Sequence, residues 1–118
     1  METGAHGKPF FPQYPGLFFN LSHAGKRVMC VISDRPVGCD VEEIRSGYRK
    51  VGGHYFTEEE QCFIEAGANT EECDSRFFRL WTMKESAVKA TGQGLTLPLN
   101  SFTITISDEG PRIEGLSD

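Results

Sequence analysis

The sequence predicts an α+β fold, in which an antiparallel sheet of about four or five strands carries one long helix across a face. Three β-like runs occur close together, over residues 17–22, 27–33 and 37–42, and their short connections favour an antiparallel meander. A helical pattern of apolar side chains extends from residue 75 to 91. An alternating run at 101–106 supplies a further strand, which we expect to pair into the same sheet.

Local signals set the limits of the predicted helices. Thr57 and Glu60 fit a capping box, which opens a short helix that ends near Gly67. Gly92 or Gly94 stops the long helix, because glycine readily adopts the left-handed conformation found there. The apolar face of the long helix is expected to consist of Phe77, Leu80, Trp81, Met83, Ala87 and Val88.

Length and charge restrict the classes of protein to which the chain can belong. The 118 residues allow one modest core, so we expect residues 1–118 to form a single domain, behind an irregular Gly- and Pro-rich lead-in at 1–16. A net charge of −5 argues against a general nucleic-acid binder. We expect neither a membrane span nor a signal peptide, because the sequence shows no pattern typical of either. The expected location is cytoplasmic. Four cysteines are therefore expected to be reduced and mostly packed: Cys30, Cys39, Cys62 and Cys73.

Two carboxylates lie near the end of the third predicted strand. Asp40 and Glu42 are two residues apart, so they share a strand face. Two like charges held together cost energy unless a cation lies between them, and Mg²⁺ accepts one or two carboxylates together with phosphate oxygens. The alternative is that both residues belong to the solvated face of an amphipathic strand.

The long helix is basic in an otherwise acidic chain. Glu85 and Lys89 are one turn apart, and taken by themselves they suit a surface ion pair. However, Arg76, Arg79 and Lys84 also lie on this helix, so it suits an anionic ligand or an acidic partner.

A polar turn follows the first predicted strand. Ser22 and His23 precede Lys26, and a hydroxyl, an imidazole and an ammonium in a turn can bind phosphate. The alternative is a turn in which Ser22 only caps backbone groups.

Together these stretches resemble the 4′-phosphopantetheinyl transferase family, in its larger Sfp-like branch. The joint presence of Gly-Cys-Asp-Val-Glu at 38–42 and of Trp-Thr-Met-Lys-Glu at 81–85 is specific to that family. Sfp-like enzymes resemble two similar halves in tandem with coenzyme A between them, and this chain matches the second half. The matching segments, in family order, are residues 7–9, 19–25, 37–42, 55–60, 78–89 and 92–95.

The resemblance implies transfer of 4′-phosphopantetheine from coenzyme A to a serine of an acyl, peptidyl or polyketide carrier protein, which is the activity of a holo-acyl-carrier-protein synthase. Adenosine 3′,5′-bisphosphate would be released. Asp40, Glu42 and Glu85 would hold Mg²⁺, with Mn²⁺ as the alternative metal. Lys89 would stabilise charge on the leaving phosphate. Glu60 or Glu85 would take the proton of the serine hydroxyl.

The resemblance also assigns a donor-binding set and leaves the state of the chain open. Lys8, Ser22 and His23 match positions that contact the adenosine and phosphate end of coenzyme A. With only the second half present, the chain is either an inactive fragment or a unit that pairs with itself or with a complementary half-chain. A non-catalytic module that binds coenzyme A or a carrier protein is the alternative function; nucleic acid and membrane are not expected partners.

Overall fold

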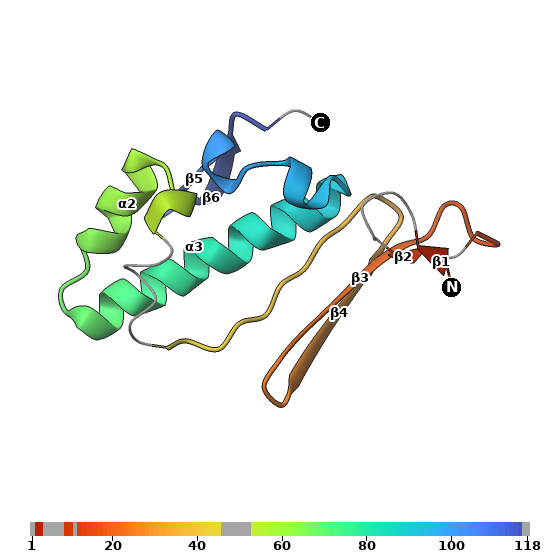
Figure 1. Ribbon diagram of the computed structural model, residues 1–118, viewed down its shortest axis with the longest axis horizontal. Helices are drawn as coiled ribbons and strands as arrows, with labels where there is room; N and C mark the ends of the chain where they lie inside the picture. The colour runs from red at the N-terminus through yellow and green to blue at the C-terminus, as the bar shows by residue number, and fades with distance from the viewer. Residues whose placement is uncertain (1, 4–8, 11, 46–52, 117–118) are drawn as a thin grey trace. The chain divides into compact units, whose positions relative to one another are not determined.

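The computed structural model describes residues 2–3, 9–10, 12–45 and 53–116. Within these residues it confirms the mixed α+β class, with two α-helices and three antiparallel strand pairs (Figure 1). The chain divides into two compact units. Unit 1 comprises Met1–Glu42 and Thr82–Leu97, and unit 2 comprises Glu43–Trp81 and Pro98–Asp118.

Unit 1 is built on the hairpin of β3 (Phe18–Ala24) and β4 (Arg27–Ser33). The predicted run at 27–33 coincides with β4, and the run at 17–22 is displaced by one or two residues at its ends. Gly25 makes the turn with a φ of 57°, which glycine adopts without steric cost. The hairpin is therefore encoded by local signals, namely two β-branched and aromatic runs around a tight turn.

Two very short strands occur in the stretch that was expected to be irregular. β1 (Glu2–Thr3) pairs antiparallel with β2 (Pro9–Phe10). The lead-in therefore contains some regular structure, although each strand has only two residues.

The third predicted strand, at residues 37–42, is wrong. This segment pairs with no strand of the described chain, and two of its backbone N–H groups are bound by side chains instead. Cys39 donates its N–H to Asn20 Oδ1 at 3.0 Å, and Val41 donates its N–H to Ser22 Oγ at 3.0 Å. Because Asn20 and Ser22 lie on the same face of β3, their side chains replace the carbonyl groups of a neighbouring strand.

α3 (Thr70–Thr91) begins five residues before the predicted start and ends at the predicted residue. Gly92 follows it with a φ of 73°. The last turns of α3 belong to unit 1, where Gly38 packs against the helix backbone. A Cβ on Gly38 would lie 2.5 Å from the nitrogen of Ala90 and even closer to the carbonyl oxygen of Ser86. Glycine is required here because the backbones approach so closely.

Unit 2 contains α2 (Glu58–Glu65), β5 (Thr103–Ser107) and β6 (Gly110–Glu114). β5 pairs with β6 across a tight turn. The expectation of one sheet of four or five strands is thus wrong for the described residues, whose strands pair two by two. The described residues also contain three single-turn 3₁₀ helices: η2 (Gly53–Tyr55) and η4 (Leu99–Ser101) in unit 2, and η3 (Gly94–Thr96) in unit 1.

The predicted capping box at the start of α2 is confirmed. Glu60 Oε1 accepts the N–H of Thr57 at 2.9 Å, and Thr57 Oγ1 accepts the N–H of Glu60 at 3.4 Å. Glu60 Oε2 accepts the N–H of Ile104 on β5 at 2.8 Å. The Glu60 side chain, which is only 1% exposed, therefore fastens α2 to β5 as well as capping the helix.

Aromatic rings form much of the core of unit 2. The ring of Phe77 is stacked on that of Trp81, with centroids 6.3 Å apart, and meets Phe56 edge-on at 5.1 Å. Of the predicted apolar face, Phe77 and Leu80 are buried in unit 2, and Val88 is buried in unit 1. Lys84 is also completely buried, which its charge did not suggest.

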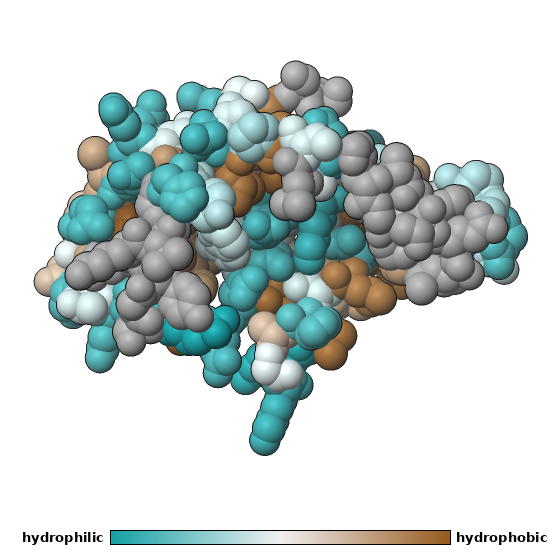
Figure 2. Space-filling model, in the orientation of Figure 1, coloured by the Kyte–Doolittle hydropathy of each residue, from teal (hydrophilic) through white to brown (hydrophobic). Residues whose placement is uncertain are grey.

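One face of the β3–β4 hairpin is apolar and exposed. Leu21, Val28, Cys30 and Ile32 share this face by strand register, and all four are exposed. Hydrophobic surface is visible among hydrophilic side chains in Figure 2. In the part of the chain that is described, no helix is both long and apolar enough to cross a membrane.

All four cysteines are free thiols, as expected, but only Cys39 and Cys73 are packed. Cys30 and Cys62 are exposed. The expectation of mostly packed thiols therefore holds for two of the four.

We expect Gly38→Ala to lower the free energy of unfolding by about 1–3 kcal/mol, because the added methyl group overlaps the backbone of α3. Gly16→Ala is the matched control: no atom lies within 4 Å of a Cβ at that position, so its effect should stay within about 0.5 kcal/mol. Urea unfolding followed by circular dichroism measures both variants. A Gly38→Ala chain as stable as its parent would contradict the close approach.

Candidate functional site

Asp40 is the central residue of the candidate site in unit 1. Its side chain is 8% exposed, and Oδ1 accepts the hydroxyl hydrogen of Ser22 at 3.2 Å and pairs with Lys89 Nζ at 3.4 Å. Oδ2 is buried and has no hydrogen-bond partner among the described residues. A buried carboxylate oxygen without a partner costs roughly 1–3 kcal/mol. Asp40 therefore presents an acceptor that a cation would satisfy.

Lys89 joins α3 to the segment that carries Asp40. Besides pairing with Asp40, its Nζ donates to the carbonyl oxygen of Cys39 at 3.0 Å. The side chain is 31% exposed, so the ammonium group remains accessible from solvent. The pair thus brings together two residues that are 49 positions apart in the sequence.

Glu85 lies one turn before Lys89 and is influenced by the same charges. Burial raises the pKa of the Glu85 carboxyl, the charge of Asp40 raises it further, and Glu42 adds a smaller effect, while Lys89 opposes the rise. Asp40, Glu42 and Glu85 are thus within electrostatic reach of one another. Holding these like charges near each other is unfavourable without a cation.

The three carboxylates do not form a closed metal site by geometry alone. Among the described residues, no three His, Cys, Asp or Glu side chains are grouped so that they could hold a metal ion. The donor set nevertheless consists only of oxygen, which suits a hard cation such as Mg²⁺. The buried and unpartnered Oδ2 of Asp40 fits such an ion as well.

The residues expected to bind coenzyme A differ in their exposure to solvent. Ser22 is buried and points toward Asp40, whereas His23 follows on the opposite face of β3 and is exposed. Lys8 lies outside the described residues. Glu60, a candidate base, belongs to unit 2, where both of its carboxylate oxygens accept backbone N–H groups.

Asn20 is a site residue that the sequence analysis missed. It is 5% exposed, and besides accepting the N–H of Cys39 through its side chain it accepts the Cys39 thiol through its carbonyl oxygen at 3.4 Å. Burial raises the pKa of the Cys39 thiol, so this cysteine is a packed neutral group. The available signal was the spacing of Asn20 and Ser22, since asparagine is unusual in a strand unless its side chain has a partner.

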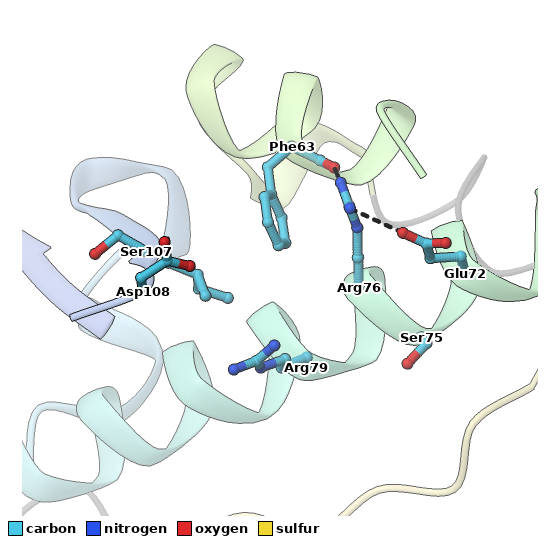
Figure 3. A pocket seen from close by; sticks show the side chains of 8 residues that line it. Phe63, Glu72, Ser75, Arg76, Arg79, Ser107 and Asp108 are labelled. Atoms are coloured by element: carbon cyan, nitrogen blue, oxygen red, sulfur yellow. Dashed lines mark hydrogen bonds and ion pairs between the residues drawn. The ribbon is translucent and has the colours of Figure 1, made fainter. Parts of the chain in front are cut away.

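A separate pocket of about 460 Å³ lies within unit 2 (Figure 3). Arg76 is fixed there by hydrogen bonds to the carbonyl oxygen of Phe63 at 2.7 Å and to Glu72 at 2.8 Å. Arg79 and Asp108 also line the pocket. Since acidic and basic side chains both line it, nothing in its charge selects a ligand. With Lys84 buried, the expected basic face of α3 is smaller than its sequence suggested.

Comparison with known proteins gives a family match and several relatives. A family model described as the 4′-phosphopantetheinyl transferase superfamily matches residues 36–117. The 4′-phosphopantetheinyl transferase Sfp of Bacillus subtilis (strain 168) is 36% identical over 109 residues, which are 92% of this chain and 48% of that protein. The 4′-phosphopantetheinyl transferase psf-1 of Bacillus pumilus is 39% identical over 118 residues, 99% of this chain and 50% of that protein. The chain therefore spans about half the length of these relatives.

We expect Glu85→Gln to raise the stability of the metal-free chain. A raised carboxyl pKa means that the folded chain disfavours the ionised form, so removing that charge at neutral pH relieves repulsion. Because Glu85 is only half-buried, the gain should be about 0.5 kcal/mol, or roughly 2–4 °C in melting temperature. Differential scanning fluorimetry in EDTA measures it, with the exposed Glu59→Gln as the control. A fall in melting temperature would show that Glu85 is instead held by favourable contacts.

Proposed function

The chain belongs to the 4′-phosphopantetheinyl transferase superfamily, and from this premise we propose that it acts in Mg²⁺-dependent transfer of 4′-phosphopantetheine from coenzyme A to a carrier protein. The serine oxygen of the carrier forms a bond to the phosphorus that bears the pantetheine arm. The bridging oxygen of the pyrophosphate leaves with adenosine 3′,5′-bisphosphate. The observation that carries this proposal is the buried, unpartnered Oδ2 of Asp40 in a group of carboxylates beside Lys89.

Asp40, Glu42 and Glu85 are the proposed metal ligands. When bound, Mg²⁺ or Mn²⁺ would neutralise charge on the pyrophosphate and orient it for in-line attack. The three side chains supply the negative charge that such an ion needs, and their mutual repulsion in its absence supports this role. A domain that only docks to a carrier protein would not need them, and this favours the enzymatic function over a binding module.

Lys89 is proposed to stabilise the charge that develops on the leaving phosphate. Its ammonium group is held near Asp40 by the carbonyl oxygen of Cys39, so its position is set before substrate arrives. A preorganised cation of this kind lowers the energy of a transition state without reorganising.

Glu85 is the better supported of the two candidate bases. Its carboxyl group lies within electrostatic reach of Asp40, Glu42 and Lys89, so it belongs to the candidate site. Glu60 already uses one oxygen to cap α2 and the other to bind β5, and its side chain is almost fully buried. We therefore propose that Glu85, directly or through a water molecule, takes the proton of the serine hydroxyl.

The proposed partners are coenzyme A and an acyl, peptidyl or polyketide carrier protein. Of the residues assigned to coenzyme A, His23 is exposed and suits contact with a phosphate. The chain spans about half the length of these relatives. A second copy or a complementary half-chain is the further partner proposed for the complete site. An inactive fragment that keeps only the metal-binding group is the alternative.

Incubation of an apo carrier protein with the chain, coenzyme A and Mg²⁺ should add the mass of one phosphopantetheine, as intact-mass spectrometry would detect. EDTA should abolish the gain, and Glu85→Gln should lower the rate by at least about 100-fold, the loss typical of a group that acts in the transition state. Addition at the full rate by Glu85→Gln would reject the proposed role. A folded chain that binds Mg²⁺ but transfers nothing would support the alternative of an inactive fragment.

Glu60→Gln should reduce stability rather than the rate of transfer. In the parent, both carboxylate oxygens of Glu60 accept a backbone N–H. Glutamine replaces one of these oxygens by an NH₂ group, which leaves one N–H without an acceptor, so we expect the free energy of unfolding to fall by about 1–3 kcal/mol. The rate per folded molecule should stay unchanged. Unfolding curves and initial rates measure the two effects, with Glu59→Gln as a neighbouring exposed control. A stable Glu60→Gln chain that has lost transfer would identify Glu60 as the base.

A further inference from the structure

We propose that Ser22 is a positioning residue for Asp40, and that its hydroxyl turns Oδ2 of that carboxylate toward the metal. The inference rests on the metal site proposed above. It assigns Ser22 a task different from the contact with coenzyme A that the family resemblance implied.

The hydrogen bonds of Ser22 fix the orientation of its hydroxyl group. A serine hydroxyl donates one hydrogen and accepts through two lone pairs. Val41 donates its backbone N–H to Ser22 Oγ at 3.0 Å, and the hydroxyl hydrogen goes to Asp40 Oδ1 at 3.2 Å. The side chain is buried, at 8% exposure. Its hydrogen is thus committed to the carboxylate and is not free for a phosphate oxygen of coenzyme A.

These contacts decide which oxygen of Asp40 remains available. Oδ1 is bound by Ser22 on β3 and by Lys89 on α3. The two contacts hold the plane of the carboxylate in one orientation, in which the other oxygen, Oδ2, has no partner in the described chain. Residues that orient a metal ligand in this way affect metal affinity although they never touch the ion.

Asn20 fixes the position of the whole segment relative to β3. Its side chain accepts the N–H of Cys39, and Ser22 accepts the N–H of Val41, two residues further along the chain. With the residue on each side of Asp40 held, the segment cannot slide along the strand. Ser22 thereby combines backbone anchoring with carboxylate orientation, while Asn20 provides anchoring alone.

The test is Mn²⁺ binding in the absence of coenzyme A, followed by electron paramagnetic resonance of free Mn²⁺. Ser22→Ala should weaken Mn²⁺ binding about 10-fold or more, as loss of a ligand-orienting hydrogen bond does. Ser22→Thr keeps the hydroxyl and should restore most of the affinity. Ser33→Ala is the matched control on β4, since Ser33 Oγ also accepts a backbone N–H, that of Arg35 at 3.1 Å; it should bind Mn²⁺ as the parent does.

The possible results distinguish positioning of Asp40 by Ser22 from contact of Ser22 with coenzyme A. They also test the metal site separately from the role of Ser22. Unchanged Mn²⁺ affinity in Ser22→Ala would overturn the positioning role. A raised KM for coenzyme A in the same variant would then assign Ser22 to direct contact with the donor. A parent chain that binds no Mn²⁺ would overturn the metal site itself and, with it, this inference. Circular dichroism checks folding, and if Ser22→Ala unfolds, the near-isosteric Ser22→Cys replaces it. Because a thiol is a weak donor, it too should weaken Mn²⁺ binding; parent-like affinity would reject the inference.

Discussion

A carboxylate that is removed from water needs hydrogen bonds or an opposite charge, and unit 1 is organised around this need at Asp40. One oxygen is satisfied by a hydroxyl from β3 and an ammonium group from α3. Both groups reach this oxygen because the segment 38–41 lies between β3 and α3. Hydrogen bonds from the segment to Asn20 and Ser22 hold it against the strand, and the close approach of Gly38 brings it against the helix. The local architecture therefore follows from the requirements of a single charge.

The elements with strong local signals were predicted well from the sequence. The capping box of α2, the end of α3 and the β3–β4 hairpin each depend on residues close together in the chain. The segment 37–42 was mistaken for a strand because its alternation is that of a strand, whereas its backbone donors are taken by Asn20 and Ser22. Alternation shows which side chains face inward, but not what the backbone binds.

The candidate site shows a similar division. The family resemblance pointed to Asp40, Glu85 and Lys89, and in the structure their charges lie within electrostatic reach of one another. The sequence did not reveal that Lys84 is buried or that Asn20 has a structural task, because neither follows from the charge or polarity of the residue. Partners contributed by distant segments decide such roles.

The exposed apolar face of the hairpin affects how the protein can be handled. Leu21, Val28 and Ile32 leave hydrocarbon surface in contact with water, and such surfaces drive self-association as concentration rises. The thiol of Cys30 lies on the same face and is accessible to oxidants. In air, chains that meet through this face can be joined by a covalent cross-link. Dilute samples kept under a thiol-free reductant, such as a phosphine, therefore give the conditions in which a single folded chain can be observed.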